Sequence, residues 1–331
     1  MKDGKLFGKT AGVNQILPHV NKFAWDMYRQ GKNNNWNPED VPMNRDIKNW
    51  NDGTITDDEK LVIKRCLGFF AGSESLVGNN LVSLYHYITD PECRQYMGRQ
   101  IWEEMLHNDT IVYVCESLKL DIEEVYEAYK NVPSIKAKDD FLMDVTGGIN
   151  SLDADTSTLE GQRQVCKTAF LYWVVCEGIF FYSGFAMLLR LKDKIPGIGE
   201  QIEYTLRDES LHIQFGAKII NLIQTQYPDV WTDDFQAELI EILKEAVKLE
   251  IAYAQDVLPR GIMGLNSDMF IEYMEYIGNR RLEITNLDYQ FESDRNPFDF
   301  LSEVQDLVKA KNFFETRVTE YQQAGALSDD F

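Results

Sequence analysis

Two of the chain's four histidines follow a glutamate by three positions. These segments are residues 104–107, with the sequence EMLH, and residues 209–212, with the sequence ESLH. Residues three apart share one face of a helix, so each pair can present a carboxylate oxygen and an imidazole nitrogen to the same point. Because 54 of the 331 residues are acidic, this spacing alone is a weak indication of a metal site.

The apolar pattern of the predicted helices strengthens that indication. Glu74 shares a helical stripe with Phe70 and Val77, which places its carboxylate among core residues. Three more glutamates occupy such positions in three other helices: Glu104, Glu177 and Glu209. A buried carboxylate without a compensating charge costs several kcal/mol, so four of them require cations or protons. The alternative, solvated or ion-paired glutamates, fits this pattern poorly.

The same order of residues occurs twice along the chain. Glu74 precedes the first Glu-x-x-His segment by 30 residues, and Glu177 precedes the second by 32. Two such hairpins packed face to face would supply four carboxylates and two imidazoles, the ligand set of ferritin-like dinuclear proteins. These ligands favour Fe or Mn over Zn and suggest redox chemistry with O₂. Metal-assisted hydrolysis stays open, although the sequence indicates no separate general base.

Helix signals cover most of the chain after residue 55. Thr56 and Glu59 form a capping box before a helix to about residue 87, and Asp90 with Pro91 begins one to about residue 118. Further helices are predicted at about 122–129, 134–145, 157–191, 202–226, 233–257 and 267–285, the third opening on a capping box of Ser157 and Glu160. No segment alternates as a strand would, so the fold class is all-α, a ferritin-like helical bundle with a dinuclear metal site in its core.

Four regions are expected along the chain. Residues 1–54 are predicted to be irregular, with at most one short helix near residues 20–30, and residues 55–292 to form the bundle. A C-terminal turn and helix at 293–320 and a flexible tail at 321–331 follow.

Composition limits the partners and the compartment. The net charge of −21 argues against binding to nucleic acid, because phosphate backbones require a basic surface. No apolar stretch resembles a signal peptide or reaches membrane-spanning length without interruption. The five cysteines are scattered along the sequence, which is typical of free thiols in a reducing compartment. Together these features predict a cytoplasmic protein without a membrane partner.

Several motifs, in order, resemble the small, radical-generating subunit of class I ribonucleotide reductase. They are NWNPE at 35–39, FFAGSE at 69–74, EGIFF at 177–181, RDESLH at 207–212 and the tail tyrosine Tyr321, so the resemblance covers essentially the whole chain. It implies six metal ligands: Glu74, Glu104, His107, Glu177, Glu209 and His212.

The resemblance also implies roles for residues around the metals. Asp208 would orient the His107 imidazole and link it to Trp36, an electron conduit, and Tyr321 would relay electrons to the large subunit. Without the family, Asp208 would read as an exposed neighbour of Glu209 and Trp36 as a packing residue. Two further matches, Phe181 and Phe185, would line the metal pocket.

Two departures from the commoner family pattern indicate a subclass. The position of the radical tyrosine, four residues after the first ligand histidine, is Ile111, and the usual aspartate ligand is Glu74. Both resemble subclass Ic, in which an oxidised Mn/Fe pair stores the oxidising equivalent; Fe/Fe and Mn/Mn stay open. Tyr204 matches a tyrosine that passes an electron during cofactor assembly. Tyr113 is an alternative radical site, although it projects away from the Ile111 side of the helix.

The resemblance therefore implies a homodimeric ribonucleoside-diphosphate reductase small subunit, an oxidoreductase for deoxyribonucleotide synthesis. It would assemble a high-valent dinuclear cofactor with O₂ or another oxidant and drive reversible radical transfer to the large (alpha) subunit, which its tail would bind. Two alternatives stay open, a ligand-binding Mn/Fe oxidase on the same scaffold and a non-catalytic iron-binding protein. The tail tyrosine and the acidic, aromatic end at 329–331 favour the reductase.

Overall fold

The computed structural model describes residues 3–8, 12–147, 153–298 and 300–301. These residues form helices without a β-strand, apart from one isolated bridge between Ile262 and Leu265, which confirms the all-α prediction. The helices, in chain order, are α1 (Lys22–Asn33), η1 (Pro38–Asp40), α2 (Asn44–Asn51), α3 (Asp57–Tyr87), α4 (Pro91–Leu118), α5 (Ile122–Tyr126), α6 (Ala128–Asn131), α7 (Pro133–Thr146), α8 (Leu159–Ala169), η2 (Phe170–Phe180), α9 (Tyr182–Arg190), α10 (Pro196–Gln226), η3 (Pro228–Val230), α11 (Asp233–Val257) and α12 (Met269–Thr285).

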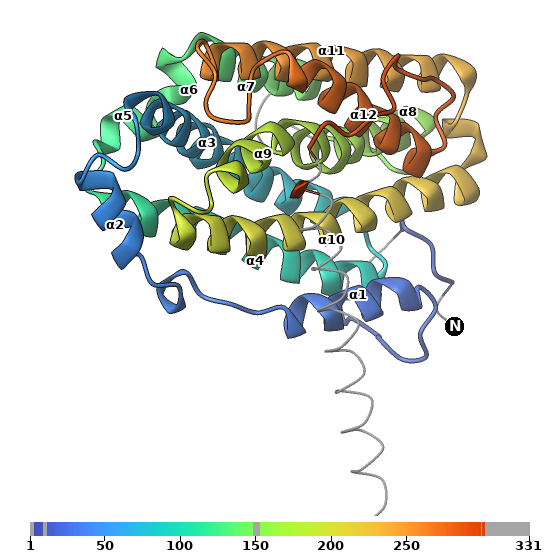
Figure 1. Cartoon of the computed structure of the whole chain (residues 1–331). Helices are drawn as coiled ribbons and strands as arrows, with labels where there is room; N and C mark the ends of the chain where they lie inside the picture. Colours follow the sequence, from blue (N-terminus) through green and yellow to red (C-terminus); the bar gives the residue numbers. More distant parts are fainter. Residues whose placement is uncertain (1–2, 9–11, 148–152, 299, 302–331) are drawn as a thin grey trace, which may run out of the picture.

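Four segments form the centre of the bundle: α3, α4, η2 and α10. Helix α3 packs along α4, and α10 packs along η2, so the two hairpins predicted from the near-repeat face each other. In Figure 1, α4 and α10 cross the lower half of the molecule, while α11 and α12 lie along its upper side. Helix α1 packs against α4 on the outside of the bundle.

Several helix boundaries follow the local signals in the sequence. Thr56 and Glu59 form the predicted capping box at the start of α3, with each side chain bonded to the backbone N–H of the other residue. Asp90 caps α4 by accepting from the Cys93 N–H. Gly147 ends α7 in the left-handed conformation, with φ of 76°.

The prediction that residues 1–54 are irregular, with at most one short helix, is wrong at α2. This second helix carries Asp46, which is buried and accepts from the N–H groups of Gly197 and Ile198 at the start of α10. Helix α2 is therefore stabilised by a contact with a helix about 150 residues away in the chain, which local periodicity does not reveal.

Other boundaries also differ from the prediction. The capping box of Ser157 and Glu160 does not form, because Thr158 caps α8 and Ser157 bonds to Asp155 instead. The segment predicted as one helix at 122–129 is divided into α5 and α6, and α10 begins six residues earlier than expected, with Pro196 in its first turn.

The central helix predicted at 157–191 contains the π-helical segment η2. By length and composition the stretch Leu159–Arg190 could cross a membrane, but its most apolar window is entirely buried, as in the core helix of a globular protein. Two cationic side chains bind carbonyls of η2. Arg281 Nε donates to the Gly178 carbonyl at 2.8 Å, and Lys138 Nζ donates to the Phe180 carbonyl at 3.2 Å. Because π-helices are rare and these cations come from α12 and α7, the local sequence indicated only a helix.

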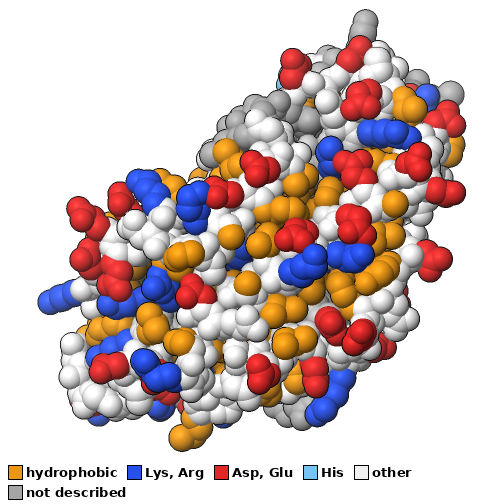
Figure 2. Space-filling view, turned by 90° about the horizontal axis from the view of Figure 1, so that it is seen from above, with side chains coloured by type: hydrophobic (Ala, Val, Ile, Leu, Met, Phe, Trp, Pro, Cys, Tyr) orange, Lys and Arg blue, Asp and Glu red, His pale blue; other side chains and the backbone are white. Residues whose placement is uncertain are grey.

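Figure 2 shows the surface of the upper side of the bundle. Lys and Arg side chains are interspersed with Asp and Glu side chains, and apolar side chains lie between them. The described residues form no continuous basic surface on this face. The predicted tail at 321–331, with Tyr321, lies outside the described residues, as does most of the predicted segment at 293–320.

Candidate metal centre

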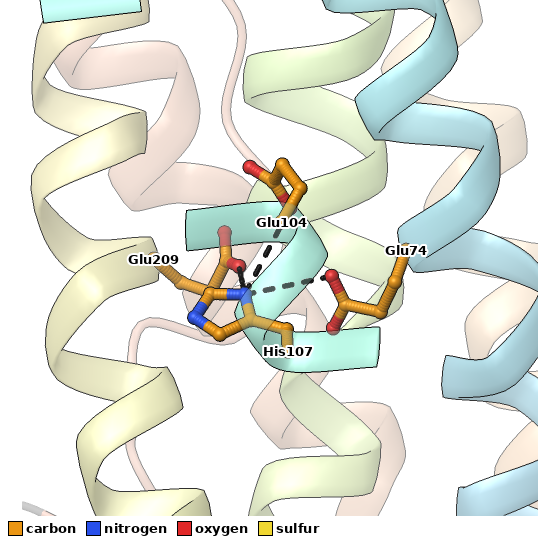
Figure 3. A group of neighbouring side chains, drawn as sticks. All are labelled: Glu74, Glu104, His107 and Glu209. Atoms are coloured by element: carbon orange, nitrogen blue, oxygen red, sulfur yellow. Dashed lines mark ion pairs between the residues drawn. The ribbon is translucent and has the colours of Figure 1, made fainter. Parts of the chain in front are cut away.

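The bundle brings the six predicted ligands together in its core. Two groups of side chains each place one ligand atom per residue within 4.8 Å of the others. The first group is Glu74, Glu104, His107 and Glu209, shown in Figure 3, and the second is Glu104, Glu177, Glu209 and His212. Because Glu104 and Glu209 belong to both groups, the cluster could hold two neighbouring metal ions that share these carboxylates.

One ring nitrogen of each histidine points into the cluster. His107 Nδ1 lies 3.1 Å from Glu209 Oε1 and 3.6 Å from Glu74 Oε2, and the dashed lines of Figure 3 converge on this atom. His212 Nδ1 lies 3.2 Å from both Glu104 Oε1 and Glu209 Oε2. The two Glu-x-x-His segments therefore face each other across the core from α4 and α10.

The other nitrogen of each histidine meets a further carboxylate. His107 Nε2 lies 3.6 Å from Asp208 Oδ2, the atom that also accepts from Trp36 Nε1 at 2.8 Å. His212 Nε2 lies 2.9 Å from Glu103 Oε2. Carboxylates in this position fix the ring orientation and tautomer of metal-binding histidines. The expected order Trp36, Asp208, His107 is thus present as a set of contacts.

Glu103 is a site residue that the sequence reasoning missed. It directly precedes Glu104, just as Asp208 directly precedes Glu209, and each serves the histidine of the opposite helix. The repeated acidic pair before each x-x-His was therefore a usable signal. Glu103 was not recognised because, without the opposite helix, a second acid next to Glu104 resembles a solvated residue. In the structure it is completely buried.

Two arginines compensate the charge of these outer carboxylates. Arg99 Nε donates to Glu103 Oε1 at 2.8 Å, and Arg207 Nε donates to Asp208 Oδ1 at 3.3 Å. The same arginines bind the segment that leads to Trp36, Arg99 through the Asn35 side chain and Arg207 through the Asn34 carbonyl. The four glutamates of the cluster itself then remain, and two divalent cations would neutralise them.

The four inner glutamates fit a pair of metal ions. Each has a buried oxygen that accepts no hydrogen bond from the described residues: Glu74 Oε2, Glu104 Oε2, Glu177 Oε2 and Glu209 Oε1. Three of these oxygens, all but that of Glu177, lie 3.1–3.8 Å from His107 Nδ1. Unpaired buried carboxylate oxygens are costly in a protein core, and binding a cation would remove that cost. A ligand set of carboxylates and imidazoles is one that binds Fe and Mn.

The pKa values of the cluster residues also indicate that the cluster requires positive charge. Burial raises the pKa of Glu74 to about 8 and the pKa of Glu177 well above its ordinary value. Burial alone would lower the pKa of His107, but Asp208, Glu104 and Glu209 raise it well above the ordinary value. Protons therefore supply the positive charge in the metal-free cluster, and metal ions would displace them.

Aromatic rings form one wall near Glu74. Phe70 stacks on Phe185 with ring centroids 5.3 Å apart and meets Phe181 edge to face at 5.4 Å. All three rings are buried. Phe181 and Phe185, the two residues expected to line the metal pocket, thus form one apolar cluster with Phe70. Phe70 precedes Glu74 by four residues in α3.

The two tyrosines considered for electron transfer, Tyr113 and Tyr204, make different contacts. Ile111 is buried, and Tyr113 turns to donate its hydroxyl to the Val41 carbonyl at 3.0 Å. The ring of Tyr204 lies 5.2 Å from that of Trp36, centroid to centroid, and its hydroxyl donates to Glu200 at 2.8 Å. Trp36 and Tyr204 are therefore in contact, whereas Tyr113 is anchored to the loop before α2.

Comparison with known proteins agrees with this geometry. Residues 13–297 match the family model "Ribonucleotide reductase, small chain". The chain is 49% identical over 330 residues to the ribonucleoside-diphosphate reductase subunit beta of Chlamydia pneumoniae, covering 99% of this chain and 95% of the relative.

Two solved structures share the fold. The ribonucleotide reductase R2 subunit from Clostridium botulinum has a TM-score of 0.81 at 23% identity, over 90% of this chain and 92% of the other. The Rnr4 homodimer of the ribonucleotide reductase from Saccharomyces cerevisiae has a TM-score of 0.75 at 19% identity, over 96% and 92%. Both confirm the predicted ferritin-like helical bundle.

Proposed function

This chain belongs to the family of ribonucleotide reductase small chains, and we propose that its buried cluster holds a dinuclear metal cofactor that supplies the radical for a large catalytic subunit. The family match identifies the chain as the small subunit of a ribonucleoside-diphosphate reductase, an oxidoreductase. The single observation that carries the proposal is the pair of four-residue groups that share Glu104 and Glu209.

The ligands of the proposed cofactor are Glu74, Glu104, His107, Glu177, Glu209 and His212. When bound, a Mn/Fe pair would supply a one-electron oxidant, with Fe/Fe and Mn/Mn as alternatives and O₂ or another oxidant as the activating reagent. Asp208 and Glu103 orient the two imidazoles from the outer side.

We assign the chain to the subclass without a radical tyrosine. The support is Ile111, a buried hydrocarbon side chain at the family's radical position, together with the glutamate at position 74. Tyr113 remains the alternative radical site. Its hydrogen bond to the Val41 carbonyl gives its phenol proton an acceptor that is not a carboxylate, which favours the neutral phenol over a proton-coupled oxidation.

The proposed radical route begins at Trp36. Its indole N–H donates to Asp208 Oδ2, so this carboxylate can hold the Nε1 proton while the ring is oxidised and return the proton when the ring is reduced. Asp208 also contacts His107, which connects the ring to the cluster. Tyr204, in ring contact with Trp36, is suited to deliver an electron during cofactor assembly. Tyr321 in the tail would carry the route to the large subunit.

We further propose a cytoplasmic homodimer whose C-terminal tail binds the large subunit. The similar yeast structure is a homodimer, which supports the same state here. Light scattering of the purified chain should therefore give the mass of two copies. A large multi-subunit shell would instead favour iron storage.

The cofactor proposal is tested by metal loading. Metal-depleted protein is loaded with iron alone, manganese alone or both, exposed to O₂, and assayed by paramagnetic resonance and by turnover with its large subunit. We expect the highest turnover with both metals and no tyrosyl signal. Highest turnover with iron alone and a tyrosyl signal would contradict the subclass, and a long-chain lipid retained in the core would favour the oxidase alternative.

A further inference from the structure

A neutral side chain, Gln100, lies between two of the candidate metal ligands. It is completely buried and precedes Glu104 by one turn of α4. Its amide nitrogen Nε2 donates to Glu177 Oε1 at 2.9 Å and to Glu104 Oε1 at 3.3 Å. Gln100 therefore connects a carboxylate of α4 with one of η2, across the contact between the two hairpins.

The orientation of the Gln100 amide is determined by its partners. Trp173 Nε1 lies 3.0 Å from Gln100 Oε1, and an indole N–H can only donate. The Gln100 amide oxygen must therefore face Trp173, which turns the NH₂ group towards Glu177 and Glu104. The opposite amide orientation would leave the indole without an acceptor and set the amide oxygen against two carboxylates.

The position of Trp173 is itself constrained. Gly216 of α10 lies against this indole so closely that a Cβ at residue 216 would be 2.2 Å from Trp173 Cβ. Phe215 meets the indole edge to face at 5.4 Å. Trp173 is also completely buried, so its ring cannot turn away from Gln100 without displacing α10.

These contacts give the two oxygens of Glu177 different roles. Oε1 accepts from Gln100, whereas Oε2 is buried without a hydrogen-bond partner among the described residues. A neutral amide achieves this without adding charge, so the four inner glutamates keep the charge that two divalent cations would balance. A lysine or arginine at residue 100 would instead compete with a metal ion for Glu177.

We infer that Gln100 is a positioning residue that holds Glu177 Oε1 away from the metal and leaves Oε2 as the ligand atom, with Trp173 fixing the direction of its amide. The inference rests on the proposed dinuclear site. Because Glu177 belongs only to the second ligand group, Gln100 acts mainly on the metal ion held by Glu104, Glu177, Glu209 and His212.

The test is an anaerobic titration of the metal-depleted full-length protein with Mn(II), monitored by bound metal and by paramagnetic resonance. Gln100→Met keeps a side chain of similar length but removes both amide donors. We expect it to weaken binding of the Mn(II) ion at the second ligand group, called the second Mn(II) below, by roughly 10–100-fold. This is the usual effect of losing a hydrogen bond that orients a metal ligand. The signal of a coupled Mn pair should give way to that of an isolated Mn(II).

The matched control is Gln201→Met. Gln201 is also completely buried, but it bonds to the Gly197 carbonyl at the start of α10 and contacts none of the six candidate ligands. This control should bind two Mn(II) ions as the wild type does. A purely structural role of Gln100 would lower thermal stability in both variants and leave the second Mn(II) affinity unchanged in both.

The part played by Trp173 is tested by Trp173→Phe, which removes the N–H and keeps an aromatic ring. We expect it to weaken the second Mn(II) by about 2- to 10-fold, the effect of one neutral hydrogen bond. The double variant Trp173→Phe/Gln100→Met should bind no more weakly than Gln100→Met alone, because Trp173 acts through Gln100.

Three results separate the possible failures. If wild-type protein binds two metal ions with neither Mn(II) alone, iron alone nor both together, the proposed dinuclear function is wrong. If wild type binds two and Gln100→Met binds the second as tightly, the inference about Gln100 is wrong. If Gln100→Met does not fold, the Trp173→Phe titration decides, and an unchanged second affinity there overturns the inference.

Discussion

At the residue scale, the candidate centre is defined by pairs of adjacent acids that face in different directions. Glu104 and Glu209 point into the core, while their neighbours Glu103 and Asp208 each contact the histidine of the opposite helix. The two sides differ in one respect. An arginine binds each of these acids, but only Asp208 also accepts from an indole, that of Trp36, among the described residues.

Because of this difference, we expect Asp208→Asn and Glu103→Gln to affect metal binding alike but turnover differently. Both should weaken metal binding by roughly 10–100-fold, because each orients a ligand histidine. Per assembled cofactor, only Asp208→Asn should reduce turnover with the large subunit, since only Asp208 contacts Trp36. Metal content and turnover are measured on the same samples. Equal turnover per cofactor in the two variants would contradict the proposed route through Trp36.

A second prediction at this scale concerns Asp139 of α7. Its side chain is 8% exposed, and burial raises its pKa from 3.8 to about 7. The folded state therefore holds this proton more tightly than the unfolded state. The resulting destabilisation is absent below about pH 4, grows as the pH rises to about 7 and is complete above it.

Asp139→Asn should remove that destabilisation. We expect its free energy of unfolding to exceed the wild-type value by up to about 4 kcal/mol at pH 8, and the difference to shrink towards pH 4. Urea denaturation of metal-depleted protein at several pH values measures it. Asp144→Asn, an exposed position of the same helix, is the control. A difference independent of pH would refute the assignment to Asp139.

At the element scale, the π-helical segment η2 decides how Glu177 enters the core. Carbonyls of η2 are held by Arg281 from α12 and Lys138 from α7, and its Trp173 is held against α10. Lys138 is completely buried and forms an ion pair with Glu250 of α11, with 2.6 Å between Nζ and Oε2. Four helices thus contribute to the position of one carboxylate.

The close approach of Trp173 predicts an unusual response at Gly216. Alanine normally stabilises a helix interior relative to glycine, but Gly216→Ala would place a methyl group against the indole. We expect a loss of roughly 1–3 kcal/mol in the free energy of unfolding, measured by urea denaturation.

Gly98→Ala of α4 is the matched control for this substitution. A Cβ at residue 98 would meet nothing within 4 Å, so alanine there should stabilise by about 0.5–1 kcal/mol. If Gly216→Ala stabilised the protein as Gly98→Ala does, the packing of η2 on α10 described here would be wrong.

At the scale of the whole molecule, the acidic cluster couples metal binding to protons and to folding. Burial gives Glu74 a pKa of about 8 in the metal-free chain, so this carboxyl carries a proton at neutral pH. A metal ion needs the deprotonated form, and the core that positions the six ligands exists only in the folded chain.

Metal loading should therefore raise the melting temperature and release protons. At a free Mn(II) concentration 100 times Kd, we expect about 2.7 kcal/mol of added stability for each ion bound. The apparent affinity should fall as the pH drops below about 8, because protons then compete for Glu74. Calorimetry in buffers of different ionisation enthalpy counts the protons. Unchanged melting with and without Mn(II), at any pH, would argue against a metal site.

The tail provides the prediction for the complete enzyme. Tyr321→Phe should leave metal content and cofactor assembly as in wild type, because the proposed relay acts after the cofactor is formed. Turnover with the large subunit should be lost, since phenylalanine has no phenol to oxidise. Retention of deoxynucleotide formation in the reconstituted pair would remove Tyr321 from the route.

The sequence alone determined the helical class and the six candidate ligands. Both depend on local features: the spacing of Glu104 and His107 on one helix face, the glutamates on apolar stripes, and the near-repeat of the hairpin. Only the tertiary structure revealed Glu103 at His212, from which it is 109 residues away, as well as α2, the π-helical form of η2 and the Gln100 contacts. These features arise where helices remote in sequence pack together, and helical periodicity specifies which face of a helix is buried but not which residue meets it.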